Sequence, residues 1–183
     1  ILEDSAATNT KLGISCTTRK ERPKEINGVS YFFITNEKFK DKIKNKELLE
    51  YAEVYGNLYG TPKDWVLSVL SKGENVLLEL DTQGALQVKE SFPESKTIFI
   101  IPPSYEDLAK RLELRAQDSN EEILRRLKEA KKEVNVGKDF DQIVVNNNFE
   151  ETLNDLKQFI FRGQKPSIAR QDAVNESLNL LLD

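Results

Sequence analysis

The stretch Val76-Leu77-Leu78-Glu79-Leu80, which runs directly into Asp81, indicates the fold class of this chain. Its apolar run is nearly unbroken, as is typical of a parallel strand that helices cover on both faces. Thr97–Ile101 and Gln142–Val145 are two further short apolar runs of this kind. Helical patterns separate the three runs, and strands that alternate with helices predict an α/β fold with a parallel sheet.

The helical patterns carry start signals and apolar stripes. Pro102-Pro103 ends the second strand, and Ser104 with Asp107 forms a capping-box-like start for the next helix. Glu121–Val134 has its apolar residues on one face and acidic residues in its first turn. Two more amphipathic helices are expected at Phe149–Phe161 and Ser167–Leu181.

The segment Gly13–Tyr59 breaks the alternation of strands and helices. Leu12–Cys16 and Val29–Ile34 are predicted strands, and Asn36 is expected to cap a helix. Thr61-Pro62 predicts another helix start, with the hydroxyl at the N-cap and proline in the first turn. The segment is therefore interpreted as an insert of strands and loops that carries substrate-binding groups.

Composition excludes several kinds of protein. The 183 residues include 27 basic and 31 acidic side chains, a formal charge of -4, so no overall basic footprint favours nucleic acid or an anionic membrane. No stretch approaches the ~20 apolar residues of a membrane span. We expect a cytoplasmic protein with no nucleic-acid or membrane partner, in which any bound anion meets a local basic site.

The chain has no histidine and one cysteine, Cys16. These counts exclude an intramolecular disulfide, serine–histidine and cysteine–histidine catalysis, and zinc sites built on histidine. The chemistry of this protein must therefore use other side chains.

A loop in the insert carries two arginines three residues apart, Arg19 and Arg22, with Ser15 before them and Tyr31 after them. Planar guanidiniums with hydroxyl and phenol groups are suited to bind the oxygens of a phosphate. The alternative is a solvated charged loop.

A second group in the insert contains Glu50, Tyr59 and Thr61. A carboxylate can accept from two N–H donors on one edge of guanine while a hydroxyl contacts its oxygen, a pattern that adenine does not match. Taken alone, Glu50 could equally be a surface acid.

Short motifs follow one another in a fixed order along the chain: Ser15–Arg19, Arg22-Pro23, Asn27-Gly28, Tyr31–Phe33, Leu49–Ala52, Gly56–Thr61 and Asp81–Ala85. Together, from about Gly13 to about Arg162, they resemble the signatures of the guanylate kinases. The resemblance implies a P-loop nucleoside-monophosphate-kinase-like parallel sheet flanked by helices, with a mixed α+β GMP-binding insert and a helical lid. The implied parts are a core made of residues 1–12 (the remnant of a first helix), 76–111 and 127–162, a GMP-binding region at 13–61, a lid at 112–126, and a helical C-terminal tail at 163–183.

The same resemblance implies the residues that bind GMP. They are Ser15, Arg19, Arg22, Tyr31, Glu50, Tyr59, Thr61, Glu79 and Asp81. Ser15, Glu50 and Thr61 match the positions that read guanine. Four others match the positions that hold the phosphate: Arg19, Arg22, Tyr31 and Tyr59.

Catalysis and ATP binding are implied in the same way. The catalytic residues would be Arg19, Asp81, Arg115 and Arg126, and the ATP-binding residues would be Arg115, Arg126 and Asn146. Mg²⁺ would be held through the nucleotide phosphates, with Asp81 as a candidate ligand. A helix cap at a strand end is the structural alternative for Asp81, and a helix surface with ion pairs is preferred for Arg111 and Arg125.

One family signature is not found in the 183 residues, the glycine-rich phosphate-binding loop that cradles ATP. Ile1–Ser5 resembles the second half of the helix that follows this loop. Either an N-terminal segment has been omitted or the protein lacks the loop. We favour omission and expect that this chain alone is inactive. Smaller departures are Ala116 in place of a lid glycine and Asn147-Asn148 in place of acids.

The implied reaction is in-line phosphoryl transfer from ATP to GMP, giving ADP and GDP. The alternative is a catalytically inactive guanylate-kinase-like domain that binds a phosphorylated partner. The complete set of Ser15, Glu50 and Thr61 favours the enzyme. The sequence leaves the oligomeric state open.

Overall fold

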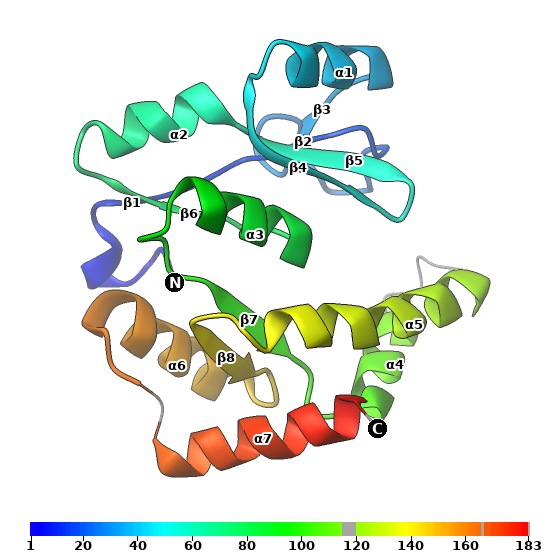
Figure 1. Ribbon diagram of the computed structural model, residues 1–183, viewed down its shortest axis with the longest axis vertical. Coiled ribbons are helices and arrows are strands. Elements are labelled where there is room, and N and C mark those ends of the chain that lie inside the picture. The colour runs from blue at the N-terminus through cyan, green and yellow to red at the C-terminus, as the bar shows by residue number, and fades with distance from the viewer. Residues whose placement is uncertain (115–119, 166, 183) are drawn as a thin grey trace. The chain divides into compact units, whose positions relative to one another are not determined.

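The computed structural model describes residues 1–114, 120–165 and 167–182 (Figure 1). The chain divides into two compact units, Leu2–Ser95 and Lys96–Asp183. Each unit has its own strands and its own helices.

The first unit contains two small sheets. A 3-10 turn at Ser5–Ala7 leads into a parallel pair of β1 (Thr10–Leu12) with β6 (Asn75–Leu77). A four-stranded sheet has the order β3-β2-β5-β4, in which β2 and β3 are parallel and the other neighbours antiparallel. Its strands are β2 (Cys16–Thr17), β3 (Phe32–Phe33), β4 (Leu48–Val54) and β5 (Asn57–Pro62). The helices are α1 (Asn36–Lys44), α2 (Lys63–Leu70) and α3 (Thr82–Ser91).

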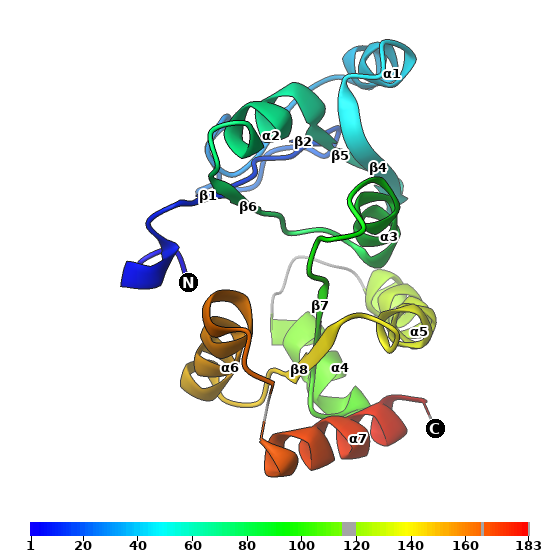
Figure 2. The same ribbon diagram turned by 60° about the vertical axis from the view of Figure 1, so that its left-hand side comes forward.

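The second unit is built on the parallel pair β7 (Ile98–Ile101) and β8 (Gln142–Val145). Its core is the cluster of Ile101, Val134 and Leu181, which lie on a strand and two helices. Helices α6 and α7 both contact β8, and α5 contacts α7 (Figures 1 and 2). The helices are α4 (Tyr105–Leu114), α5 (Asn120–Gly137), α6 (Phe149–Arg162) and α7 (Ile168–Leu182).

The prediction of an α/β fold with parallel strands flanked by helices is confirmed. The strands expected at Thr97–Ile101 and Gln142–Val145 are found within one residue. The strand expected at Val76–Leu80 ends at Leu77, because the last residue of its partner β1, Leu12, pairs with Leu77. The boundaries of the core, GMP-binding region, lid and tail stay predictions.

Several local predictions in the insert were wrong. Leu12–Cys16 is not one strand, since β1 ends at Leu12 and β2 begins at Cys16 in another sheet. In Val29–Ile34 only Phe32–Phe33 is a strand, because Val29 and Ser30 both donate their backbone N–H to the carbonyl of Ile26 in a turn.

Two predicted helix caps also differ. The side chain of Thr35, one residue before Asn36, accepts from the backbone N–H of Lys38 and caps α1. Thr61 lies in β5 rather than at an N-cap, and its hydroxyl donates to Glu50. The predicted cap at Ser104 is confirmed, since its hydroxyl accepts from the backbone N–H of Asp107.

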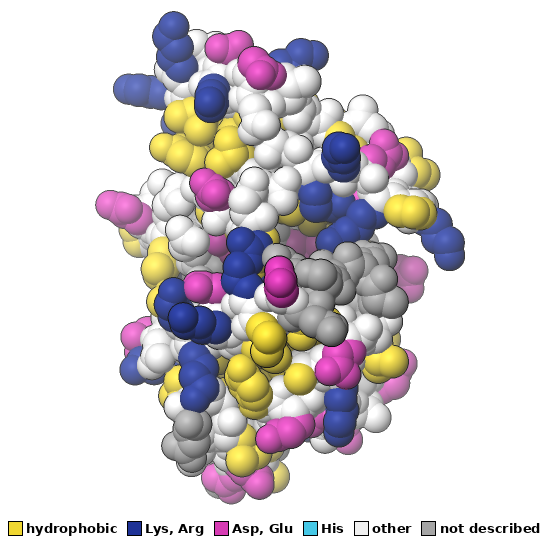
Figure 3. Space-filling model, turned by 90° about the vertical axis from the view of Figure 1, so that its right-hand side faces the viewer, with side chains coloured by type: hydrophobic (Ala, Val, Ile, Leu, Met, Phe, Trp, Pro, Cys, Tyr) yellow, Lys and Arg dark blue, Asp and Glu magenta, His cyan; other side chains and the backbone are white. Residues whose placement is uncertain are grey.

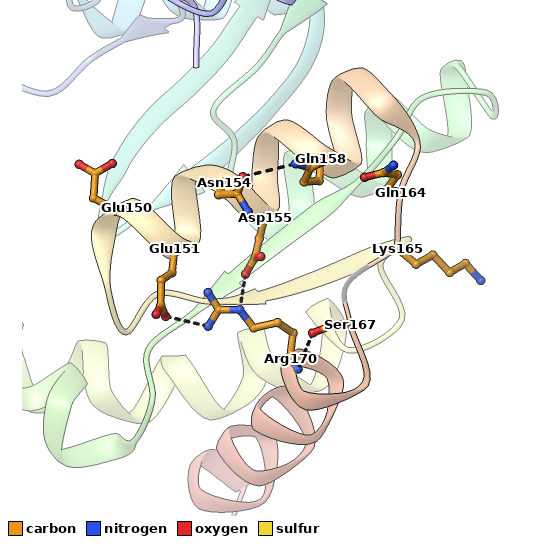
Figure 4. Close-up of a pocket in the computed structure, with 9 residues that line it drawn as sticks. All are labelled: Glu150, Glu151, Asn154, Asp155, Gln158, Gln164, Lys165, Ser167 and Arg170. Atoms are coloured by element: carbon orange, nitrogen blue, oxygen red, sulfur yellow. Dashed lines mark hydrogen bonds and ion pairs between the residues drawn. The ribbon is translucent and has the colours of Figure 1, made fainter.

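Helix α7 is joined to α6 by a forked ion pair (Figure 4). The guanidinium of Arg170 lies 2.9 Å from a carboxylate oxygen of Glu151 and 3.1 Å from one of Asp155. This pair lines a pocket of about 580 Å³ formed by Glu150, Glu151, Asn154, Asp155, Gln158, Gln164, Lys165, Ser167 and Arg170. None of these residues is a predicted site residue, so the arrangement is interpreted as an attachment of α7.

Arg170→Ala is expected to lower the free energy of unfolding by about 1 kcal/mol, the upper range for partly exposed ion pairs. The reason is that Asp155, whose side chain is 15% exposed, would lose its charged partner. Urea unfolding at low salt measures the change, with the exposed Lys165→Ala as control. Equal stability of the two variants would contradict a stabilising role for this ion pair.

Candidate functional site

Three of the predicted site residues form one chain of hydrogen bonds. The Thr61 hydroxyl donates to Glu50 Oε1 at 2.7 Å, and Ser15 Oγ lies 3.4 Å from Thr61 Oγ1. Since the Thr61 proton is directed at Glu50, Ser15 is the donor in its contact with Thr61. The antiparallel pairing of β4 with β5 brings Glu50 and Thr61 together although 11 positions separate them.

Glu50 is a buried acid, with only 3% of its surface exposed. Burial raises the pKa of its carboxyl group, the hydrogen bond from Thr61 opposes this shift, and the negative charge of Asp81 adds to it. A carboxylate has about four lone-pair sites, so Glu50, which accepts from Thr61, has acceptor capacity left for N–H donors of a ligand.

Glu50→Gln is expected to stabilise the protein at neutral and alkaline pH by about 1 kcal/mol, as is common when a strained functional group is removed. The folded-state pKa of Glu50 is raised, so the folded chain binds more protons than the unfolded chain between the two pKa values. Stability therefore falls as pH rises through this window, and the cost is fully present above it. The neutral amide avoids that cost.

Urea unfolding at pH 8 and near pH 3, well below the ordinary pKa of a glutamate, tests this expectation. The gain should be present at pH 8 and should disappear at the acidic end, where Glu50 is protonated in both states. Glu53→Gln, on the exposed face of the same strand, is the matched control. A Glu50→Gln variant that is less stable than the parent at pH 8 would contradict the assignment.

The second cluster surrounds Arg19. Its guanidinium donates to both carboxylate oxygens of Glu25 at 2.8 and 3.0 Å, and this pairing is the main cause that raises the pKa of Arg19. The Arg19 Cζ atom lies 5.4 Å from the centroid of the Tyr31 ring, which lies 6.0 Å from that of Tyr59. Three residues predicted to hold phosphate are thus brought together.

Arg22 reaches this cluster through its backbone. Its N–H donates to Glu25 Oε2 at 2.8 Å, and its carbonyl accepts from the N–H of Glu25. The Arg22 side chain is exposed. The sequence analysis does not identify Glu25, which bonds to Arg19 and to the backbone of Arg22 and so holds this loop together. Its position three residues after Arg22 is the spacing of a β-turn and could have indicated this role.

Asp81 is the N-cap of α3. Its Oδ1 accepts from the backbone N–H of Gly84 at 2.9 Å, so the structural interpretation of Asp81 as a helix cap is confirmed and its catalytic role stays a prediction. Glu79, the other predicted acid of this segment, is exposed.

Among the described residues, no group of three or more acids, cysteines or histidines could hold a metal ion. Mg²⁺ is commonly bound by one or two carboxylates together with substrate phosphates. Asp81 fits this mode, since the α3 cap engages Oδ1 and leaves Oδ2 for a ligand.

The remaining predicted residues belong to the second unit. Asn146 directly follows β8, and its backbone N–H donates to the carbonyl of Ile101 at 2.7 Å. Arg111 donates to the Asn146 carbonyl at 2.6 Å, a structural role with a carbonyl rather than an acid as partner. Arg126 is half-buried on α5. Arg115 and Ala116 lie outside the described residues.

Charged side chains of both signs are interspersed over the molecular face in Figure 3. This distribution agrees with the small net charge of the chain. No helix within the described ranges is both long enough and apolar enough to cross a membrane.

The parallel α/β fold, with a mixed insert that gathers acid–hydroxyl and arginine–tyrosine clusters, is the architecture of a nucleotide-binding kinase. The guanylate kinase family model matches residues 1–163, and the chain belongs to this family.

Individual relatives agree. The guanylate kinase of Hahella chejuensis is 48% identical over 161 residues, which cover 88% of this chain and 77% of the relative. That of Photobacterium profundum is 42% identical over 183 residues, which cover 100% of this chain and 88% of the relative. The crystal structure of guanylate kinase from Anaplasma phagocytophilum superposes with a TM-score of 0.74 at 34% identity, over 95% of this chain and 86% of that one.

Proposed function

We propose that this protein is a guanylate kinase, which transfers the γ-phosphoryl group of ATP to GMP and yields ADP and GDP. The observation that carries the proposal is the hydrogen-bond chain of Ser15, Thr61 and Glu50, of which Thr61 and Glu50 are buried. A cytoplasmic location is part of the proposal, because ATP and GMP are its substrates.

This hydrogen-bond chain supports guanine recognition. The Glu50 carboxylate would accept from N1–H and the 2-amino group of the base. Thr61 would keep its hydrogen bond to Glu50, and the Ser15 hydroxyl would turn its proton from Thr61 to O6. Because Glu50 and Thr61 are nearly inaccessible to solvent, a base without matching donors would leave a buried charge unpaired. Adenine presents the opposite pattern and would be rejected.

The arginine–tyrosine cluster supports binding of the GMP phosphate. Glu25 holds the Arg19 guanidinium through one pair of its five N–H donors, and the phosphate would accept from the N–H groups that Glu25 does not engage. Arg22, Tyr31 and Tyr59 would complete this site.

Phosphoryl transfer requires that the two nucleotides are positioned and that negative charge is neutralised, and it does not require a general base. The nucleophile is a phosphate oxygen that is already anionic at neutral pH, which fits a chain without histidine. Asp81 would hold Mg²⁺, which neutralises charge on the ATP phosphates when bound. Arg115 and Arg126 would donate to the transferring phosphoryl group, and Asn146 would lie near adenine.

The alternative function is a domain that binds phosphorylated protein segments. Such a domain needs the arginine–tyrosine cluster but has no use for a buried guanine-reading acid. The intact set of Ser15, Glu50 and Thr61 therefore favours the kinase.

GMP-dependent production of ADP from Mg·ATP by the complete gene product tests the proposal, with AMP and CMP as control acceptors. Activity with GMP that exceeds activity with AMP at least 100-fold is the expected result. Binding of GMP without turnover would instead support the phosphate-binding domain.

A further inference from the structure

The side chain of Gln87 attaches helix α3 to the edge of the four-stranded sheet. The Gln87 amide accepts from the backbone N–H of Tyr51 at 3.2 Å and donates to the carbonyl of the same residue at 2.8 Å. Strand β4 is the last in the sheet order, so Gln87 satisfies backbone groups at an edge that no further strand covers. Tyr51 directly follows Glu50, and α3 lies along β4 in both ribbon views (Figures 1 and 2).

Gly84 lies three residues before Gln87, on the same face of α3. A Cβ atom at Gly84 would lie 2.5 Å from Glu50 Oε2 and 3.1 Å from Asp81 Oδ1. The first turn of α3 therefore touches the carboxylate of Glu50, and only a residue without a side chain fits there.

The contacts made by Gln87 and Gly84, both on α3, bear on the same acid, Glu50. The Gln87 hydrogen bonds fix the position of α3 along β4, and Gly84 lets the capped N-terminus of the helix approach Glu50. Because Asp81 caps α3 at Gly84, this approach also places the Asp81 carboxylate beside Glu50. A shift of α3 along the strand would change the position of both acids.

We propose that Gln87 and Gly84 are positioning residues for guanine recognition: they hold the N-terminus of α3 against the Glu50 carboxylate, so that this acid faces the base edge in one orientation. The inference rests on the proposed function, in which Glu50 reads guanine. Neither residue contacts the base itself in this role. Displacement of a recognition group by about 1 Å can cost up to about 100-fold, so their effect on affinity should be measurable.

The test compares GMP with IMP, which lacks the 2-amino group that a carboxylate would accept from. Gln87→Leu removes both hydrogen bonds at nearly constant volume and is expected to weaken GMP binding about tenfold. IMP binding should weaken less, because IMP keeps N1–H but lacks the second donor to Glu50. Gly84→Ala leaves the Gln87 hydrogen bonds intact and should also lower the ratio of GMP affinity to IMP affinity. Titration calorimetry with each nucleotide on the complete gene product measures the ratio of GMP affinity to IMP affinity. In steady-state kinetics, the KM for ATP should change less than twofold.

Glu90→Ala, an exposed residue on the same helix, is the control and should keep the parental ratio. If Gln87→Leu and Gly84→Ala lower the unfolding midpoint but keep the parental GMP-to-IMP ratio, the two residues only anchor the helix and the inference is wrong. A Glu50→Gln variant with the parental ratio would overturn the proposed base recognition instead. The two failures are therefore distinguishable.

Discussion

Glu50→Gln is expected to weaken GMP binding about 100-fold and to leave the KM for ATP within twofold of the parental value. The carboxylate accepts from two donors on the guanine edge in the proposed complex. The amide keeps one acceptor, which Thr61 already occupies at 2.7 Å, and presents its NH₂ group to the donors of the base. Loss of a charge-assisted hydrogen bond costs about 2–3 kcal/mol, which corresponds to this change in affinity.

Titration calorimetry with GMP and steady-state kinetics with ATP measure the two effects. Because Glu50→Gln is expected to be more stable than the parent at pH 8, weaker binding there cannot be attributed to unfolding. Glu53→Gln, exposed on the same strand, should bind GMP like the parent. An equal loss for GMP and ATP would remove Glu50 from base recognition.

The sequence predicts the site residues whose side-chain type is itself needed to recognise the ligand, such as a carboxylate for the N–H donors of a base. The side chains predict Glu50 and Thr61 as one base-reading group, and the family resemblance adds Ser15 to it. The structure places the three residues in one hydrogen-bond chain. The bond between Thr61 and Glu50 was not predicted. Thr61-Pro62 has the local pattern of a helix start, and pairing of β4 with β5 overrides that pattern.

Residues that act through another residue were missed. Glu25 is bound to Arg19, and Gln87 is bound to backbone atoms 36 positions earlier in the chain. An acid or an amide at such a position has no distinctive neighbours in the sequence. Its partner is defined only when the loop or the sheet edge has formed.

Strand prediction succeeded where the strands lie among covering helices and failed in the insert. Ile98–Ile101 and Gln142–Val145 are continuous apolar runs, and their parallel pairing extends over their whole length. In the insert, Cys16–Thr17 and Phe32–Phe33 are each two residues long, and turns beside them end the pairing. Such short strands are determined by tertiary contacts more than by local propensity.

Arg19→Ala is expected to weaken GMP binding about 30-fold while binding of guanosine, which has no phosphate, stays within twofold of the parental value. Arg19 is held in position by two hydrogen bonds to Glu25 and by the ring of Tyr31, so its remaining N–H donors are oriented before the ligand arrives. Removal of a charge-assisted pair of bonds costs about 2 kcal/mol, and the base contacts are untouched.

Calorimetry with GMP and guanosine on Arg19→Ala and Glu50→Gln separates the two halves of the site. Arg19→Ala should lose affinity for GMP alone, whereas Glu50→Gln should lose affinity for both ligands, because both carry the guanine base. Lys20→Ala removes a neighbouring exposed charge and should change GMP binding less than threefold, since a single solvated cation contributes little at physiological salt. If Lys20→Ala and Arg19→Ala weaken GMP binding equally, the loop attracts phosphate only by its net charge. The oriented guanidinium of Arg19 is then not a specific phosphate ligand.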